Sequence, residues 1–120
     1  MTILNLTQHP ASPEQVQAGV VEPQDKAKVR ELLTFNEIPT HSQIKQTAEA
    51  LADLAKDHGA EAAMIGGALF LMAPLAQALR DRGITPLFAF TKRVVEEVTL
   101  PDGTVEKKAV FRHEGWVEAV

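Results

Sequence analysis

The chain contains no cysteine, so it can form neither a disulfide framework nor a thiolate metal site. Aromatic residues are few, with one tryptophan and no tyrosine. Positive charge is not in excess, because 12 lysines and arginines stand against 16 aspartates and glutamates. The general attraction that draws proteins to duplex DNA or anionic membranes is therefore missing, and any phosphate contact must be local.

Long apolar runs are also absent. The longest, Ala68 to Leu75, is far shorter than the roughly 20 residues that span a bilayer. The N-terminus lacks a basic region followed by an apolar stretch, so we expect no signal peptide and a soluble, cytoplasmic protein. The 120 residues, of which 45% are hydrophobic and 23% charged, are typical of one globular domain over residues 1–120.

The first third of the chain predicts a strand and two short helices. Thr2 to Thr7 is rich in leucine and β-branched residues, which favours a strand. Ser12 and Gln15 form a capping box at the start of a helix, and Val20 with Val21 suits a short strand after it. Asp25 then predicts the N-cap of a helix over residues 26–33.

The middle of the chain predicts a βαβ unit after one long helix. Thr40 or Ser42 caps that helix, and Gly59 ends it. A continuous apolar run over residues 62–65 favours a buried strand, and a helix up to Gly83 and a strand over residues 86–91 follow. A proline is tolerated in or near the first turn of a helix, so Pro74 requires this helix to start near Phe70 or later.

The C-terminal part predicts a hairpin. Val94 to Leu100 and Thr104 to Arg112 are rich in β-forming residues and flank the turn sequence Pro-Asp-Gly. The expected fold is therefore α/β, a minimal Rossmann-like, mostly parallel sheet flanked by helices, with a C-terminal antiparallel β-hairpin. Residues 1–93 form the expected core, and residues 94–120 the hairpin and tail.

Ligands of open α/β sheets bind outside the carboxyl ends of the strands, so the candidate site residues are those that follow strands. The expected ligand-binding residues are Thr7, Gln8, Gly66, Gly67 and Thr91, and the expected catalytic residues are His9, Lys92 and Arg93. The glycine pair lets helix amides approach an anion, although tight packing of strand against helix would explain it as well. Lys92 and Arg93 are the nearest counter-charge, and because neighbours in a strand point to opposite faces, only one of them should aim at the cleft.

His9 can act as a general acid or base near neutral pH, or it can simply bond a loop carbonyl. The other three histidines, His41, His58 and His113, have spacings that match no metal-ligand pattern. We therefore expect no metal and no other cofactor.

The opening sequence LNLTQHPASPEQ, a strand that runs into polar residues, His9 and a capped helix, resembles the start of small CRISPR-associated proteins with a CARF-like, Rossmann-type fold. Some of these are ring nucleases. The resemblance covers mainly residues 3–15, and it implies a homodimer that binds a cyclic oligoadenylate across its two-fold axis and linearises it without metal. The charged hairpin is not part of that pattern.

The sequence thus predicts a nucleotide-binding module, whose ligand is a small nucleotide or cyclic oligonucleotide and whose chemistry would be metal-independent phosphodiester cleavage. Two alternatives stay open. One is a phage or defence-associated interaction protein with a non-catalytic Rossmann-like scaffold, and the other is a small-molecule enzyme of unknown chemistry. An exposed hairpin and the apolar tail around Trp116 further indicate a homodimer interface.

Overall fold

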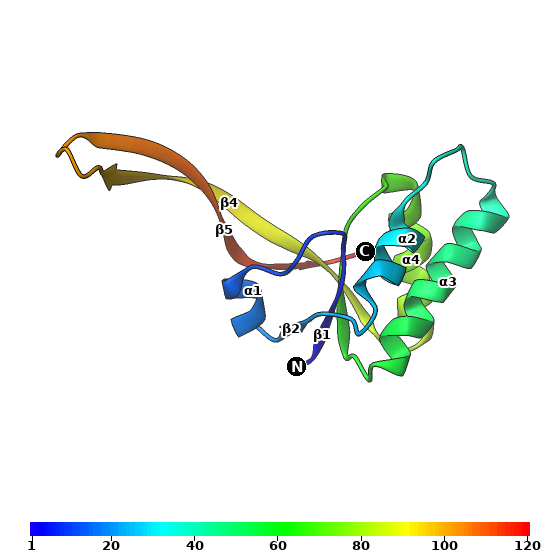
Figure 1. The fold of residues 1–120 in the computed structure, drawn as a ribbon. Helices are drawn as coiled ribbons and strands as arrows, with labels where there is room; N and C mark the ends of the chain where they lie inside the picture. Colours follow the sequence, from blue (N-terminus) through cyan, green and yellow to red (C-terminus); the bar gives the residue numbers. More distant parts are fainter.

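The computed structural model describes residues 1–120 as an α/β fold around one five-stranded sheet with the order β2-β1-β3-β4-β5 (Figure 1). The strands are β1 (Ile3–Leu6), β2 (Val20–Val21), β3 (Ala62–Ile65), β4 (Thr85–Thr99) and β5 (Val105–Glu118). The first four run parallel to their neighbours, and β5 pairs antiparallel with β4. The predicted fold class, a mostly parallel sheet with a C-terminal antiparallel hairpin, is confirmed.

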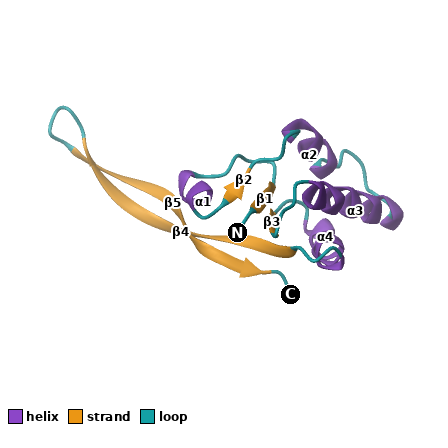
Figure 2. Cartoon of the chain, turned by 90° about the horizontal axis from the view of Figure 1, so that it is seen from below, coloured by secondary structure: helices purple, strands orange, loops and turns teal.

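The helices cover the two faces of the sheet unequally (Figure 2). The helices are α1 (Pro13–Gln17), α2 (Lys26–Leu33), α3 (His41–Asp57) and α4 (Leu69–Asp81). The last three lie on one face, where buried leucines and alanines of α3 and α4 pack against Leu4, Leu6 and Ile65. On the other face α1 lies alone over a smaller cluster that includes Ile3, Met64 and Leu87.

The helix starts follow the local chemistry that the sequence predicts. Ser12 and Thr40 each accept a hydrogen bond from the third helical amide of their helix and receive the reciprocal glutamine bond of a capping box. Asp25 caps α2 at the amide of Lys28. The long helix α3 ends at Asp57, and Gly59, two residues later, has a φ of 65° that an L-residue adopts only with strain. None of the helices is long and apolar enough to cross a membrane.

Pro74 lies deeper in α4 than the sequence indicates. The helix begins at Leu69, so the proline is its sixth residue and stands in the second turn. It therefore removes the backbone hydrogen bond that residue 74 would donate to the carbonyl of Phe70. Burial of Leu71, Leu75 and Leu79 against the sheet compensates for the missing bond.

The hairpin differs from the sequence expectation at both ends. No break occurs at Lys92 and Arg93, because β4 runs continuously from Thr85 to Thr99. Beyond the hairpin, β5 returns into the sheet, where Glu118 and Trp116 pair with Leu87 and Ala89. The division at residue 93 therefore does not separate core from hairpin, since the last residues of β5 are a strand of the core sheet.

Residues 91–113, which we call the arm, project from the body of the domain as a twisted two-stranded ribbon (Figure 1). The arm makes the molecule elongated, with extents of 57 × 34 × 27 Å. Gly103, with a φ of 86°, closes the turn at the tip, where its amide donates to the carbonyl of Leu100. A β-bulge between Phe90 and Thr91 marks the base of the arm.

Candidate ligand site at the carboxyl edge of the sheet

The strand order contains a topological switch point between β1 and β3. From β1 the chain moves to β2 on one side of the sheet and then crosses to β3 on the other side. The helices that follow these two neighbouring strands, α1 and α4, consequently lie on opposite faces. In open α/β sheets this divergence opens a crevice at the carboxyl edge, where ligands bind.

A hollow of about 440 Å³ lies at this switch point. We call it the carboxyl-edge pocket. Its lining residues come from the loop after β1, the start of α1, the end of β3 and its following loop, and β4: Thr7, Gln8, His9, Pro10, Ser12, Gln15, Met64, Ile65, Gly66, Gly67, Phe88 and Ala89. No carboxylate is among them, although the chain carries 16. A hollow without carboxylates in an acidic protein is suited to an anion.

The structure brings five of the eight sequence-predicted site residues together in this pocket. Thr7, Gln8 and His9 approach from the β1 side, and Gly66 and Gly67 from the β3 side. The other three, Thr91, Lys92 and Arg93, do not line it. They are exposed on β4, beyond the lining residue Ala89 and past the bulge.

Buried Asn5 shapes the loop that carries His9. Its side chain is fully buried, and its Nδ2 donates to the backbone carbonyl of His9 at 2.8 Å and to the Glu22 carboxylate at 3.0 and 3.1 Å. Its Oδ1 accepts from the amide and the hydroxyl of Thr7, at 3.0 and 2.6 Å. Every polar group of this buried amide side chain is thereby bonded, so the loop is held in one conformation.

Glu22 and Lys26 complete the support beneath the same loop. The Lys26 ammonium donates to the carbonyl of Thr7 at 2.7 Å and pairs with Glu22 at 3.0 Å. Burial alone would raise the pKa of Glu22, but the hydrogen bonds from the Ala11 amide, Asn5 and Lys26 outweigh it and lower that pKa. The carboxylate therefore stays ionised and anchors the loop at neutral pH.

The connection from β3 to α4 borders the pocket with Gly66 and Gly67. Gly67 has a φ of 138°, and the N-cap residue Ala68 supplies no side-chain cap. The Leu71 amide donates to the Ala68 carbonyl at 3.0 Å, but the amides of Leu69 and Phe70, the first two of the 13-residue helix α4, have no acceptor within the chain. Their partial positive charge, added to the helix dipole, favours an anion at this position.

The polar side chains around the pocket differ in whether their donors and acceptors already form hydrogen bonds within the chain. Thr7 donates its hydroxyl to Asn5, and Ser12 accepts the capping bond from Gln15, so both serve the fold. The imidazole of His9 is exposed and makes no hydrogen bond within the chain. Gln15 is only 9% exposed, and while its Oε1 accepts from the amide of Ser12, its Nε2 donates to no group of the chain.

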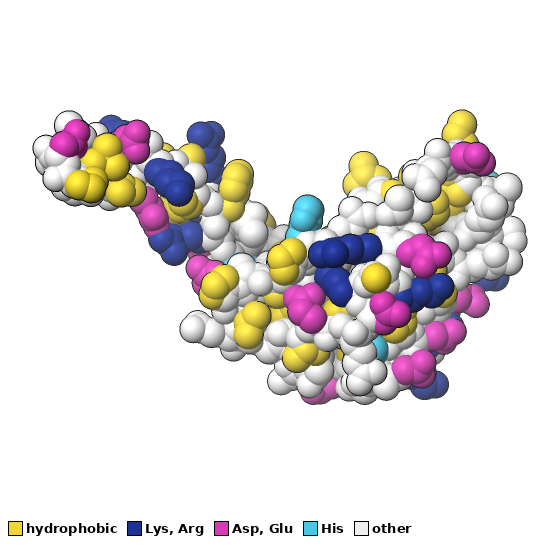
Figure 3. Space-filling view, viewed as in Figure 1, with side chains coloured by type: hydrophobic (Ala, Val, Ile, Leu, Met, Phe, Trp, Pro, Cys, Tyr) yellow, Lys and Arg dark blue, Asp and Glu magenta, His cyan; other side chains and the backbone are white.

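The pairing register of β4 and β5 shows on which face of the arm each of the adjacent cations Lys92 and Arg93 lies. Lys92 pairs across the arm with Arg112, so the two side chains share one face. Arg112 reaches Glu14 of α1 at 3.8 Å, and α1 also contributes Gln15 to the pocket. Lys92 therefore lies on the face of the arm that looks towards α1, and Arg93 on the opposite face. In the space-filling view the surface is hollowed between arm and body (Figure 3).

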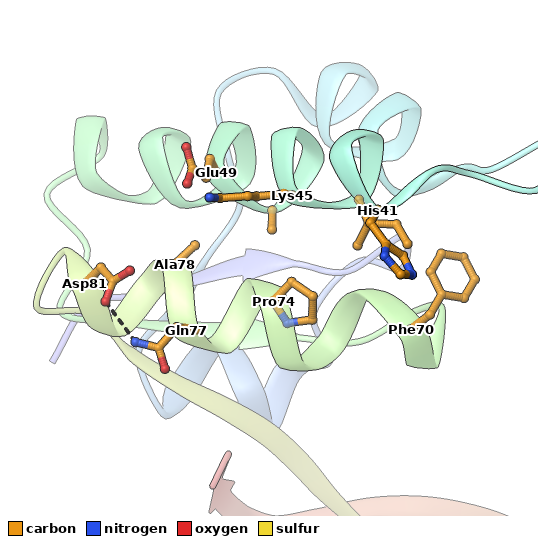
Figure 4. A pocket seen from close by; sticks show the side chains of 10 residues that line it. His41, Lys45, Glu49, Phe70, Pro74, Gln77, Ala78 and Asp81 are labelled. Atoms are coloured by element: carbon orange, nitrogen blue, oxygen red, sulfur yellow. Dashed lines mark hydrogen bonds between the residues drawn. The ribbon is translucent and has the colours of Figure 1, made fainter.

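The other hollows lie over the helix layer. A groove of about 520 Å³ lies between α3 and α4, and its lining includes Ile44, Ala48 and Pro74 as well as the charged Lys45 and Asp81 (Figure 4). Its lining is mainly apolar, and it contains none of the residues that follow strands. Two further hollows surround the loop between α2 and α3. No cluster of three or more histidines, aspartates or glutamates is placed to hold a metal ion.

Sequence reasoning missed Asn5, Glu22 and Gln15 as parts of this site. Asn5 stands inside an apolar strand, and its partner Glu22 is 17 residues away, so no local pattern connects them. A signal for Asn5 does exist, because an amide within a buried strand must find hydrogen-bond partners. The capping role of Gln15 uses only its Oε1, and its Nε2 has no hydrogen-bond partner within the chain.

The model of the family described as the uncharacterized protein MJ1673 family matches residues 1–117. No curated protein and no solved structure matches the chain.

Proposed function

This chain belongs to the uncharacterized protein MJ1673 family, and we propose that it binds the phosphate of a nucleotide in the carboxyl-edge pocket. One observation carries the proposal. The loops that follow β1 and β3, on either side of the switch point, converge on a hollow that contains glycine amides, a free histidine and no carboxylate. This is the position at which ligands bind to doubly wound sheets.

The pocket offers each part of a nucleotide a suitable surface. The phosphate is received by the backbone of Gly66 and Gly67, in the loop that leads into α4. The Nε2 of Gln15 and the imidazole of His9 are donors that no group of the chain occupies. Apolar side chains of Met64, Ile65 and Phe88 give the base or sugar a surface to pack on.

As the more specific proposal, the ligand is a cyclic oligoadenylate, which the chain linearises. The resemblance of residues 3–15 to ring nucleases supports this ligand. In this reaction a ribose 2′-oxygen attacks the adjacent phosphorus, the bond from phosphorus to the 5′-oxygen breaks, and the proton passes to that oxygen, which leaves a 2′,3′-cyclic phosphate. His9 would orient the 2′-hydroxyl, and the α4 amides would stabilise the charge on the phosphoryl oxygens.

Lys92 would supply the remaining counter-charge. It lies three residues beyond Ala89, about 10 Å along the strand. Its flexible side chain can bridge part of that distance towards a ligand that extends out of the pocket. A ring of several nucleotides extends in this way, whereas a mononucleotide does not, so the contribution of Lys92 distinguishes the two ligands.

The direct test is calorimetric titration of the wild-type chain with AMP and with cyclic oligoadenylates of several ring sizes. We expect binding that weakens about tenfold or more in His9→Ala and in Gln15→Leu, since each removes a hydrogen bond to the ligand. Thermal shift gives a second readout, because ligand at about 100 times Kd stabilises the fold by about 2.7 kcal/mol. Absence of binding by every ligand would refute the proposal.

Lys92 and Arg93 provide a matched pair for the cyclic ligand. Lys92→Ala should weaken its binding, while Arg93→Ala, which removes the same charge from the opposite face, should not. Cleavage is followed separately by chromatography of the products in the presence of a chelator. Binding without cleavage would support a nucleotide-binding module and refute the nuclease proposal.

A further inference from the structure

The two faces of the arm differ in how well their charged groups are matched within the chain. On the inner face, Arg112 pairs with Glu96 of the arm and with Glu14 of α1. Val94 and Val110 of the same face are half-buried. Contacts within one copy therefore pair Arg112 and Glu96 on this face, whereas its exposed Lys92, Glu106 and Lys108 take part in no ion pair.

The opposite, outer face has no such partners. It carries two rows of side chains, in which Arg93, Val95 and Glu97 stand on β4 opposite Phe111, Ala109 and Lys107 on β5. All six are exposed, and the side chains of Val95 and Phe111 are 63% and 74% exposed. None of the three charged groups takes part in an ion pair. A contiguous surface of this kind on a projecting element marks an interaction site.

The order of residues on the outer face makes it complementary to itself. Arg93 and Glu97 stand two residues before and two residues after Val95 on β4. If a second arm packs face to face and antiparallel on the first, with the two-fold axis at the Val95–Ala109 pair, Arg93 of each copy lies opposite Glu97 of the other. An isologous contact of this type forms every pair twice.

The β5 row matches in the same arrangement. Phe111 and Lys107 also stand two residues on either side of Ala109. Each lysine ammonium then lies over the phenylalanine ring of the other copy, which is a cation–π arrangement. The small side chains of Val95 and Ala109 meet at the axis, so the backbones can approach closely.

We propose that the outer face of the arm binds the arm of a second copy of this chain in this antiparallel, two-fold arrangement. The proposal gives the homodimer that the sequence suggests a defined surface. It is independent of the ligand, because the residues of the outer face do not line the carboxyl-edge pocket.

Charge exchange tests the arrangement by sedimentation velocity over a range of protein concentrations. We expect the wild type to dimerise, and Arg93→Glu and Glu97→Arg each to raise the dimer dissociation constant about tenfold or more, because each change converts two attractive pairs into two repulsive ones. The double variant Arg93→Glu/Glu97→Arg restores the pairs with their signs exchanged, so its dissociation constant should return towards that of the wild type. Glu106→Arg, the same charge change on the inner face, is the control and should leave dimerisation unchanged.

Cross-linking supplies a readout that does not depend on affinity. Because the chain has no cysteine, Val95→Cys introduces a single thiol at the proposed axis. A short bismaleimide should join two copies of this variant efficiently, and two copies of Glu106→Cys poorly. A wild type that stays monomeric at submillimolar concentration, a double variant that fails to recover, or equal cross-linking at both positions would overturn the proposal.

Discussion

Substitution of Asn5 by aspartate tests whether the buried amide organises the loop that carries His9. The change replaces one NH₂ group by an oxygen of nearly the same size, so packing in the strand stays the same. The new oxygen would face the carbonyl of His9 at about 2.8 Å and the Glu22 carboxylate at about 3.0 Å, the distances that the amide nitrogen has now. A donor is thus exchanged for an acceptor between two acceptors.

The expected cost follows from those contacts. A hydrogen bond to a charged group contributes about 1.5–3 kcal/mol, and a buried acceptor left without its donor costs about 1–3 kcal/mol. We therefore expect Asn5→Asp to lower the free energy of unfolding by about 3–5 kcal/mol at pH 7. Guanidinium denaturation followed by circular dichroism measures this difference, with Asn5→Leu as a variant that removes the amide without adding charge.

The pH dependence gives the prediction a second, sharper readout. Facing Glu22, the new carboxyl has its folded-state pKa raised, so the loss of stability relative to wild type grows as pH rises and shrinks as pH falls. Asn5→Leu has no group at this position that titrates, and it should not show this trend. A loss below about 1 kcal/mol, or a loss independent of pH, would refute the role assigned to Asn5.

Two further changes test neighbouring parts of the site. The pKa of Glu22 is lowered in the folded state, so its ionised form contributes stability that is present above pH 4.5, its ordinary pKa, and is lost as pH falls through the folded-state pKa. Glu22→Gln should therefore be less stable than wild type at neutral pH and should lose less stability on acidification. An equal dependence of the unfolding free energy on pH in the two proteins would contradict this. Gly67→Ala should lower the free energy of unfolding by about 1–3 kcal/mol, measured by thermal unfolding, because a φ of 138° disfavours any side chain. The nearest atoms, on Leu33 and Met72, lie 3.8 and 4.0 Å from the added Cβ, so no steric clash contributes. An unchanged melting temperature would show that the loop relaxes freely.

Local chemistry predicted much of the fold. The strands over residues 3–6 and 62–65 and the helix caps at Ser12 and Asp25 were recognisable because each depends on residues within one turn or one strand. The course of β4 through Lys92 and Arg93 was not, because adjacent charges usually mark the end of a buried strand. On an arm with water on both sides, no burial pattern distinguishes strand from loop.

The candidate site was predicted to a similar extent. The rule that ligands bind at strand ends brought Thr7, His9 and Gly67 to one pocket. It could not place Lys92 relative to Arg93, since that choice depends on the pairing of Lys92 with Arg112 and on the contact of Arg112 with α1. The supports of the loop, Asn5 and Glu22 above all, depend on contacts between distant segments, which no local pattern contains.

The arm is inserted into a strand pair that begins and ends in the body of the domain. Between the bulge and the tip, the cross-strand partners keep one register, from Thr91 with His113 to Thr99 with Val105. Removing two residues from each strand would therefore shorten the ribbon by about 7 Å and leave every remaining side chain on its original face. Removing one from each would exchange the inner and outer faces of everything towards the tip. The length of the arm can thus be changed by an even number of residues in each strand, without altering the turn at Gly103 or the sheet at Leu87.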